Sequence, residues 1–372
     1  MKNLFDKTTI NGMELRNRFV RSATWEGMCD EQGRPGEQLL NCYRELARGG
    51  VGLIITGYAF VRPDGKQMPG SIGAQSDDFA PEMQALCKAV HDEGGRLCMQ
   101  LVHTGGQGRA QGGNKLIAPS AIEAAQYTSP PVEMSLKNID DVVAAFGASA
   151  ARAKQWGFDA VQLHAAHGYL INQFLSPHTN QRNDGYGGSI ENRCRFLMEV
   201  YRSVRAAVGP GFPVLVKLNG SDFLAHGLEI DEAVIAAQAL DHEGVDAIEV
   251  SSGTPASGDN NPVRKKIDTR EHEAYNLSLA QRIKQSVSCP VLVVGGFRSL
   301  DLAREVVEKG DADYISLARP LIREPGLVKL WQEGSTARSR CISCNGCYRP
   351  GLRGKGIACI VEQAERKKAA GV

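Results

Sequence analysis

The clearest chemical signal in this sequence is the run HAAHGY, which begins at His164. In a regular strand, residues i and i+3 point to opposite faces, so His164 and His167 reach one ligand only if the strand ends between them. Gly168 permits such a change of direction. Two neutral imidazoles can each donate a hydrogen bond to one anionic or carbonyl oxygen, and the hydroxyl of Tyr169 stays protonated at neutral pH. The run therefore predicts a site that holds an oxygen and supplies a proton.

Further polar residues lie at the ends of other short apolar runs. A buried Lys, Gln or Arg in an apolar core is costly without a partner, so a shared ligand site explains these residues better than core packing does. They are Ser22, Thr24, Gln100, His103, Lys217, Ser251 and Ser252.

The elements that position these residues form one repeated pattern, in which an apolar β-branched run is followed by a helical segment. The runs are continuously apolar, as is typical of parallel strands buried on both faces. Eight such units predict an α/β fold, the (β/α)8 TIM barrel, with its active site at the carboxyl ends of the strands. The doubly wound alternative is disfavoured, because no G-x-G-x-x-G follows the first run. The predicted strands are residues 19–24, 51–57, 96–103, 159–167, 213–220, 246–253, 290–297 and 313–322.

Three segments lie outside the minimal barrel. The opening TTINGMELRN contains Asn11-Gly12 and predicts a hairpin. The connection over 104–137 is long enough to be a functional lid. We divide the chain into a barrel, residues 1–335, and a cysteine-rich C-terminal extension, residues 336–372.

The last two predicted strands indicate an anion site. Gly295-Gly296 precedes a helix with Ser299 as its expected N-cap, so backbone N–H groups are free to approach a phosphate. Arg319, which we place on the eighth strand beside Ala318, can add a charge-assisted contact.

The composition of the chain limits the classes of function that it can have. Lys+Arg number 43 and Asp+Glu 42, so no electrostatic footprint for nucleic acid or a membrane surface is present. No apolar run is long enough for a membrane helix, and the N-terminus lacks the apolar core of a signal peptide, so we expect a cytoplasmic protein. Six single cysteines are read as small core residues. The other four, Cys341, Cys344, Cys347 and Cys359, have the C-x2-C-x2-C-x11-C spacing of a metal site.

The sequence resembles the old yellow enzyme family of flavin-dependent ene-reductases, in particular its 2,4-dienoyl-CoA reductase and trimethylamine dehydrogenase branch. The resemblance covers about residues 3–335 and rests on NRFVRSAT, HAAHGYLINQFLSPHTNQRNDGYGGSIENR and GDADYISLARPLI.

The resemblance implies an FMN on top of the barrel. Ser22, Ala23 and Thr24 would line the N5–O4 edge of the flavin, Gly57 and Gln100 would contact its ring, and Lys217 would lie by N1 and O2. The phosphate would be held by Gly295, Gly296, Ala318 and Arg319. His164 and His167 would bind the carbonyl oxygen of the substrate, and Tyr169 would be the proton donor.

The activity implied is transfer of hydride from NADH or NADPH, by way of flavin N5, to the β-carbon of an α,β-unsaturated carbonyl compound or a similar activated alkene. The branch carries a 4Fe-4S cluster on C-x2-C-x3-C-x11-C, a spacing one residue longer than the one here, so zinc is the alternative for the four thiolates. A homo-oligomer and a redox partner protein are both compatible with the sequence.

Two other barrel enzymes are possible interpretations. Lys217 could be the Schiff-base lysine of a class I aldolase, which would leave Gln100 and the His-His-Tyr set without a role. The histidines could hold a metal in a barrel hydrolase, but no H-x-H follows the first strand. A purified FMN enzyme is yellow and neither of these is, so colour separates them.

Overall fold

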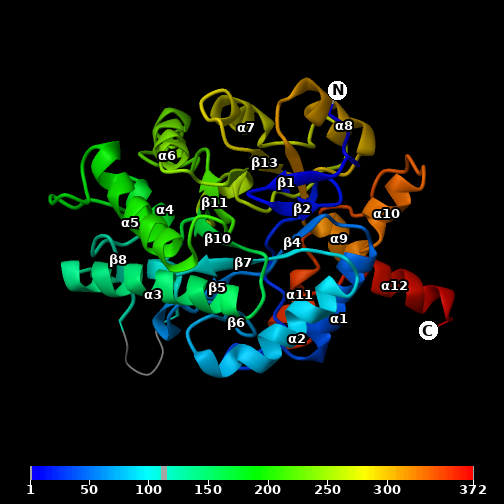
Figure 1. Cartoon of the computed structure of the whole chain (residues 1–372), viewed down its shortest axis with the longest axis horizontal. Helices are drawn as coiled ribbons and strands as arrows, with labels where there is room; N and C mark the ends of the chain where they lie inside the picture. Colours follow the sequence, from blue (N-terminus) through cyan, green and yellow to red (C-terminus); the bar gives the residue numbers. More distant parts are fainter. Residues whose placement is uncertain (1, 110–114, 372) are drawn as a thin grey trace.

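A computed structural model describes residues 2–109 and 115–371. Residues 110–114 of the predicted lid lie outside the described residues. Within the described residues, eight parallel strands form a sheet that closes on itself, because the third barrel strand, β7, pairs with the fourth, β10. Figure 1 shows these strands at the centre, with helices around them. The barrel strands are β3 (Phe19–Arg21), β4 (Leu53–Ile55), β7 (Leu97–Val102), β10 (Ala160–Ala165), β11 (Val214–Asn219), β12 (Ala247–Ser251), β13 (Val291–Val294) and β14 (Tyr314–Leu317).

Helices follow the strands in the alternation that the sequence predicts. Their apolar faces pack on the strands and form the main core. The predicted (β/α)8 barrel is thus confirmed. The helices are α1 (Glu37–Arg48), α2 (Ala80–His91), α3 (Leu136–Gln155), α4 (Leu170–Leu175), α5 (Ile190–Val208), α6 (Ile230–His242), α7 (Leu277–Lys284), α8 (Leu300–Lys309), α9 (Arg319–Arg323), α10 (Leu327–Gln332), α11 (Tyr348–Leu352) and α12 (Ile360–Ala369).

The predicted N-terminal hairpin closes one end of the barrel. Strands β1 (Thr8–Ile10) and β2 (Met13–Leu15) are antiparallel and joined by Asn11 and Gly12. Both turn residues have positive φ, 42° and 77°, as a two-residue type I′ turn requires. Apolar hairpin side chains pack with barrel-interior residues in one cluster. Because the hairpin fills this end, a ligand has the opposite, carboxyl end of the strands to enter.

The long connection after β7 contains several short elements among its described residues. It holds the short 3₁₀ helix η3 (Gly105–Gln107) and a two-stranded parallel sheet of β8 (Ile117–Ala118) and β9 (Val132–Glu133). The other short elements are β5 (Ala59–Phe60), β6 (Ile72–Gly73), η1 (Pro63–Gly65), η2 (Asp77–Phe79) and η4 (Gly258–Asn260).

The eighth strand is shorter than the sequence predicts. Strand β14 ends at Leu317, and Arg319 begins α9 instead of lying on the strand. Pro320 explains the difference, since a proline lacks the N–H that a strand ladder needs and fits the first turn of a helix.

The cysteine-rich extension lies against the barrel and begins with a polar clamp. The carboxylate of Glu273 is 2.8 Å from the guanidinium of Arg338, and Arg298 donates to the carbonyl of Ser339 over 2.8 Å. Farther along, the buried guanidinium of Arg323 pairs with Glu365 of α12. The extension is thus held at its start and again at its last helix.

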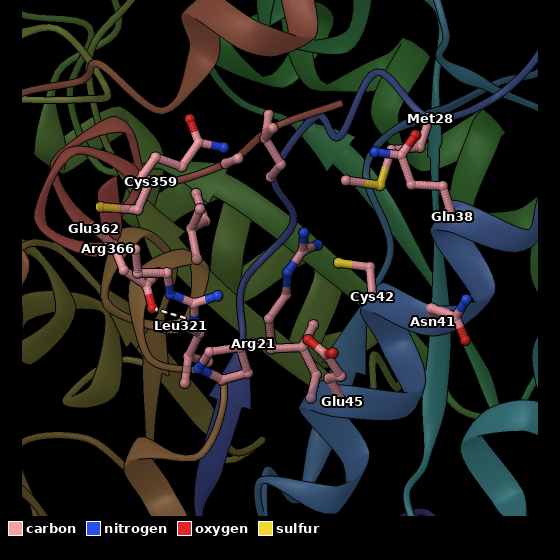
Figure 2. Close-up of a pocket in the computed structure, with 16 residues that line it drawn as sticks. Arg21, Met28, Gln38, Asn41, Cys42, Glu45, Leu321, Cys359, Glu362 and Arg366 are labelled. Atoms are coloured by element: carbon pink, nitrogen blue, oxygen red, sulfur yellow. Dashed lines mark hydrogen bonds and ion pairs between the residues drawn. The ribbon is translucent and has the colours of Figure 1, made fainter. Parts of the chain in front are cut away.

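A cavity of about 340 Å³ separates α1 from the end of the extension. Figure 2 shows Cys42 on the α1 side and Cys359 and Glu362 on the other, with Arg21 between them. The two cysteines therefore lie on opposite walls.

Within residues 2–109 and 115–371, no helix has the length and hydropathy that a bilayer crossing needs.

Candidate active site at the carboxyl ends of the barrel strands

A cavity of about 530 Å³ opens at the carboxyl ends of the strands. Nine of the predicted site residues line it: Ser22, Ala23, Thr24, Gln100, His164, His167, Tyr169, Lys217 and Ala318. Gly296 and Arg319 line an adjoining recess of about 50 Å³ that shares Val294, Ala318 and Tyr348 with the cavity. Gly57 and Gly295 line neither space.

The two histidines meet because the strand ends between them. Strand β10 stops at Ala165, and His167 and Gly168 then adopt φ values of 60° and 75°. The imidazole rings of His164 and His167 lie 5.0 Å apart between centroids, nearly perpendicular. This is the break in the strand that the spacing predicts.

Both imidazoles are neutral donors. Nδ1 of His164 accepts the backbone N–H of Ala166 over 3.3 Å, which leaves the proton on Nε2. Nε2 of His167 lies 2.7 Å from Oγ of Ser251. Burial lowers the pKa of each ring well below its usual value, helped for His164 by His167 and for both rings by Lys217. The pair therefore offers N–H groups without positive charge.

Tyr169 stands beside the histidine pair. Its ring centroid is 4.8 Å from that of His164 and 5.5 Å from that of Tyr58. Its hydroxyl donates to the side-chain oxygen of Gln67 over 2.9 Å. Burial raises the pKa of Tyr169 above its usual value, so the hydroxyl keeps its proton. The geometry suits a proton donor.

A chain of polar side chains crosses the barrel at the floor of the cavity. Lys217 donates from Nζ to Ser22 over 2.8 Å and lies 3.3 Å from Oε2 of Glu249. Gln162 donates to Oε2 of Glu249 over 3.0 Å and accepts from Gln100 over 2.7 Å. Strand register explains the chain, since Gln100 pairs with Gln162 and Lys217 with Glu249 on neighbouring strands.

The phosphate side differs in part from the sequence-based expectation. Ser299 does precede α8, but its hydroxyl donates to Glu273, whose carboxylate also accepts the N–H groups of Arg298 and Ser299. The start of α8 is therefore already occupied by a protein anion. The N–H groups of Gly295 and Gly296 are left as the backbone donors that the prediction needs.

Two predicted residues have protein partners in this structure. Arg319 donates from Nη1 to the carbonyl of Arg264 over 2.7 Å and to Oδ1 of Asn345 over 2.6 Å. Gly57 donates its N–H to Glu26 and Tyr43 instead of facing the cavity. The flavin contacts expected of both residues stay predictions.

Two of the polar residues predicted at strand ends contact other protein groups and so support the fold. His103 lies 3.4 Å from the carboxylate of Asp64 and is fully buried. Ser252 donates to Asn276 over 2.6 Å.

The sequence interpretation missed one wall of the cavity. Trp25, Tyr58 and Met68 line it together with Asn345 and Tyr348 of the extension. Trp25 and Tyr58 belong to an apolar cluster against which Met68 and Tyr348 pack. The aromatic residues beside the predicted sites were a usable signal, but nothing in the sequence places the extension over the cavity.

The residues at the cavity fit an anionic ligand that has hydrogen-bond acceptors and a phosphate. Lys217 and Gln100 offer hydrogen-bond donors at the floor, and the recess by Gly296 suits a phosphate. Among the described residues, no group of three or more His, Cys, Asp or Glu side chains is placed to hold a metal ion. The cavity thus has room and donors for a flavin at the carboxyl ends of the strands, where barrel enzymes have their active sites.

The chain is a member of the NADH:flavin oxidoreductase / NADH oxidase family, which residues 3–337 match. It is 36% identical to a metal reductase of Desulforamulus reducens over 99% of this chain and 55% of that protein. It is 36% identical to an NADPH dehydrogenase of Bacillus subtilis over 87% of this chain and 92% of that one.

Among solved structures, a 2-naphthoyl-CoA reductase in complex with 2-naphthoyl-CoA matches with a TM-score of 0.88 at 28% identity. The match covers 96% of this chain and 56% of the reductase. The chain thus spans about half the length of its longer relatives. The family assignment confirms the resemblance and the FMN-dependent oxidoreductase class drawn from the sequence.

We expect Arg319→Ala to lower FMN occupancy without changing the chemistry of the occupied fraction. The guanidinium lines the recess and can pair with a phosphate. Flavin released per chain on denaturation measures the effect. Asn345→Gly is the control, because it removes the shorter of the two hydrogen bonds from Arg319 to the extension, leaves the one to the carbonyl of Ser343, and keeps the cation. If both variants lost FMN occupancy equally, the role of Arg319 would be to hold the extension in place. Gly296→Val is a poorer test, since φ is +74° there and a Cβ would lie 3.0 Å from the Tyr275 ring.

Stability should fall as the pH drops below about 6.5, the usual histidine pKa. In the folded protein the pKa of both His164 and His167 lies well below that value, because the rings are buried. The unfolded chain therefore binds protons that the folded chain does not, and acid favours unfolding. Thermal unfolding between pH 7.5 and 5.5 tests this. The His164→Ala/His167→Gly variant should lose less stability over this range, and parallel curves would contradict the prediction.

Proposed function

We propose that the protein reduces activated alkenes, such as α,β-unsaturated carbonyl compounds, with NADH or NADPH as the reductant. The observation that carries the proposal is the neutral histidine pair beside a protonated tyrosine, over a floor that contains one buried lysine. FMN, when bound, would accept hydride from the nicotinamide and pass it to the β-carbon of the alkene.

The side chains then have separate tasks. His164 and His167 donate hydrogen bonds to the carbonyl oxygen and stabilise the negative charge that develops on it. Tyr169 gives a proton to the α-carbon. Lys217 places positive charge at the floor, where an anionic reduced ring is stabilised. The aromatic and methionine wall excludes water from the reacting carbon.

Anaerobic mixing tests this function. The yellow protein should bleach with NADH or NADPH, and an enone such as cyclohexenone should restore its colour with formation of the saturated ketone. An aldolase would be colourless, and borohydride would trap its substrate on Lys217. Colour that never bleaches with either nucleotide would overturn the proposal.

We further propose that Cys341, Cys344, Cys347 and Cys359 hold a 4Fe-4S cluster. All four line one small cavity together with Arg319, whose charge suits an anionic cluster, and Arg323, which pairs with Glu365. The N–H of Gly346 points to Sγ of Cys344 over 3.4 Å, a contact that supports a thiolate.

The spacing of the four sulfur atoms distinguishes a cluster from a single zinc ion. Zn–S bonds of about 2.3 Å bring four thiolates to roughly 3.8 Å from one another. No three metal-ligating side chains among the described residues converge in that way. A cluster holds its thiolates farther apart, which suits cysteines spread around a cavity.

Metal analysis of anaerobically purified protein should find near four irons and four labile sulfides per chain. Cys344→Ala should lower the iron content and leave the flavin, and the distant Cys289→Ala is the matched control. One zinc per chain, or no metal with all four thiols reactive, would refute the cluster.

A redox partner protein is proposed to exchange electrons with this centre. Residues 336–372 carry eight Lys and Arg against two Glu, while the whole chain is nearly balanced. One open concavity beside the cysteines is lined by Arg349, Arg353, Lys355, Arg366 and Lys367. An acidic carrier such as a flavodoxin should therefore bind, and bind less tightly at high salt. Salt-independent binding, or none, would refute this.

A further inference from the structure

Glu249 is the charged residue of the barrel floor for which the proposed reaction has no use. It lies on β12 with its side chain fully buried, below the cavity and not among the residues that line it. Its Oε2 atom accepts from Gln162 and lies 3.3 Å from Nζ of Lys217. Its Oε1 atom has no hydrogen-bond partner.

Stability alone does not explain a carboxylate in this position. A buried carboxylate oxygen without a partner is costly, and a buried ion pair is often no more stable than apolar groups of the same size. The neighbouring interior positions of the barrel hold Leu215, Ala247 and Leu292, which shows that apolar residues pack well there. An ionised residue held in such surroundings indicates an electrostatic role.

Glu249 is placed to act on Lys217. Burial raises the pKa of Glu249, but Lys217, Ser22, Gln162 and Ser316 together bring it below its usual value, so the group is ionised. The hydrogen bond from Lys217 to Ser22 fixes the ammonium at the cavity floor. The Gln100–Gln162 chain fixes the carboxylate from the other side. A ligand in the cavity therefore meets a lysine whose charge is partly cancelled from below.

We propose that Glu249 is a positioning residue that partly offsets the charge of Lys217 and thereby lowers the reduction potential of the flavin bound above it. The proposal rests on the proposed function, which puts FMN in this cavity. A full positive charge beneath the ring would favour the anionic reduced form. The partner carboxylate weakens that preference and so makes the reduced flavin a stronger hydride donor to the alkene.

Glu249→Gln tests the proposal. Glutamine keeps the size and can still accept from Lys217, but it removes the negative charge. Equilibrated anaerobically with the same two-electron dye, the variant should show a reduced-to-oxidised flavin ratio at least about tenfold higher, which corresponds to about 30 mV. Reduction by NADH should become faster and reoxidation by cyclohexenone slower. A packing role alone would not move the two half-reactions in opposite directions.

A second variant keeps the test decisive if the glutamine variant does not fold. Glu249→Asp keeps the charge but draws it back from Lys217, so its potential should lie between those of wild type and the glutamine variant. Melting temperatures of the flavin-free proteins report any structural damage separately. Gln281→Glu, on the outer helix α7, is the matched control for a change of one charge far from the floor.

The outcomes separate this inference from the proposed function. If wild type binds no FMN or does not cycle with NAD(P)H and an enone, the proposed function fails. If wild type cycles and both Glu249 variants keep the wild-type potential, the function stands and the role of Glu249 is overturned.

Discussion

Replacing His164 and His167 together should leave FMN bound and slow enone reduction by about a hundredfold or more. The two rings lie 5.0 Å apart at one strand end and are kept neutral by burial. Neutral N–H donors gain strength when the carbonyl oxygen becomes negative, so their loss costs more in the transition state than in the ground state. Steady-state reduction of cyclohexenone and titration with a phenol, which mimics the oxygen, measure the two effects.

The backbone decides which variant to use. His167 has φ of 60°, where alanine is strained and glycine is not. His164→Ala/His167→Gly therefore removes both rings with the smaller effect on the backbone. His242→Ala, at an exposed position of α6, is the control for losing a histidine elsewhere. Wild-type rates with full flavin occupancy in the double variant would remove the pair from the mechanism.

Local sequence pattern predicted the barrel and most of the cavity. Apolar runs alternating with helical segments report burial directly, and the positions of Ser22, Gln100 and Lys217 at the ends of such runs were enough to bring them to one cavity. The break after Ala165 followed from the need for His164 and His167 to face one space.

What the sequence did not predict depends on contacts between distant residues. Glu249 and Gln162 look like single polar interruptions in apolar strands, and only the closed barrel shows that they meet across it. The position of the extension on the barrel also depends on contacts between residues that are distant in the sequence. A Cβ on Gly351 would lie 3.0 Å from the Trp25 ring, so more than three hundred residues separate the two sides of this contact. No local pattern contains that information.

The carboxylate of Glu273 shows that a sequence signal for anion binding can be correct although the anion is not the one expected. Gly295-Gly296 before a helix is a good anion signal, and an anion does bind the start of α8, but it is a side chain of the same protein. The same clamp also holds Arg338 at the start of the extension. The predicted phosphate site and the contacts that hold the extension therefore meet at one loop.

Tyr169→Phe should slow reoxidation of the reduced flavin by an enone by ~10²–10⁴-fold and leave reduction by NADH or NADPH nearly unchanged. Only the oxidative half needs a proton for the α-carbon. Phenylalanine keeps the ring contacts with His164 and Tyr58 and removes only the hydroxyl that donates to Gln67.

Stopped-flow measurement of the two half-reactions tests the role of Tyr169, with Tyr58→Phe as the matched control. Tyr58 also directs its hydroxyl to Gln67, at 3.5 Å, and lines the same cavity, so its loss perturbs the polar contact without removing the proposed donor. We expect its oxidative rate to stay within a few-fold of wild type. Equal slowing of both half-reactions by Tyr169→Phe would instead indicate that the hydroxyl orders the cavity, because a missing proton donor cannot slow a hydride transfer that needs no proton.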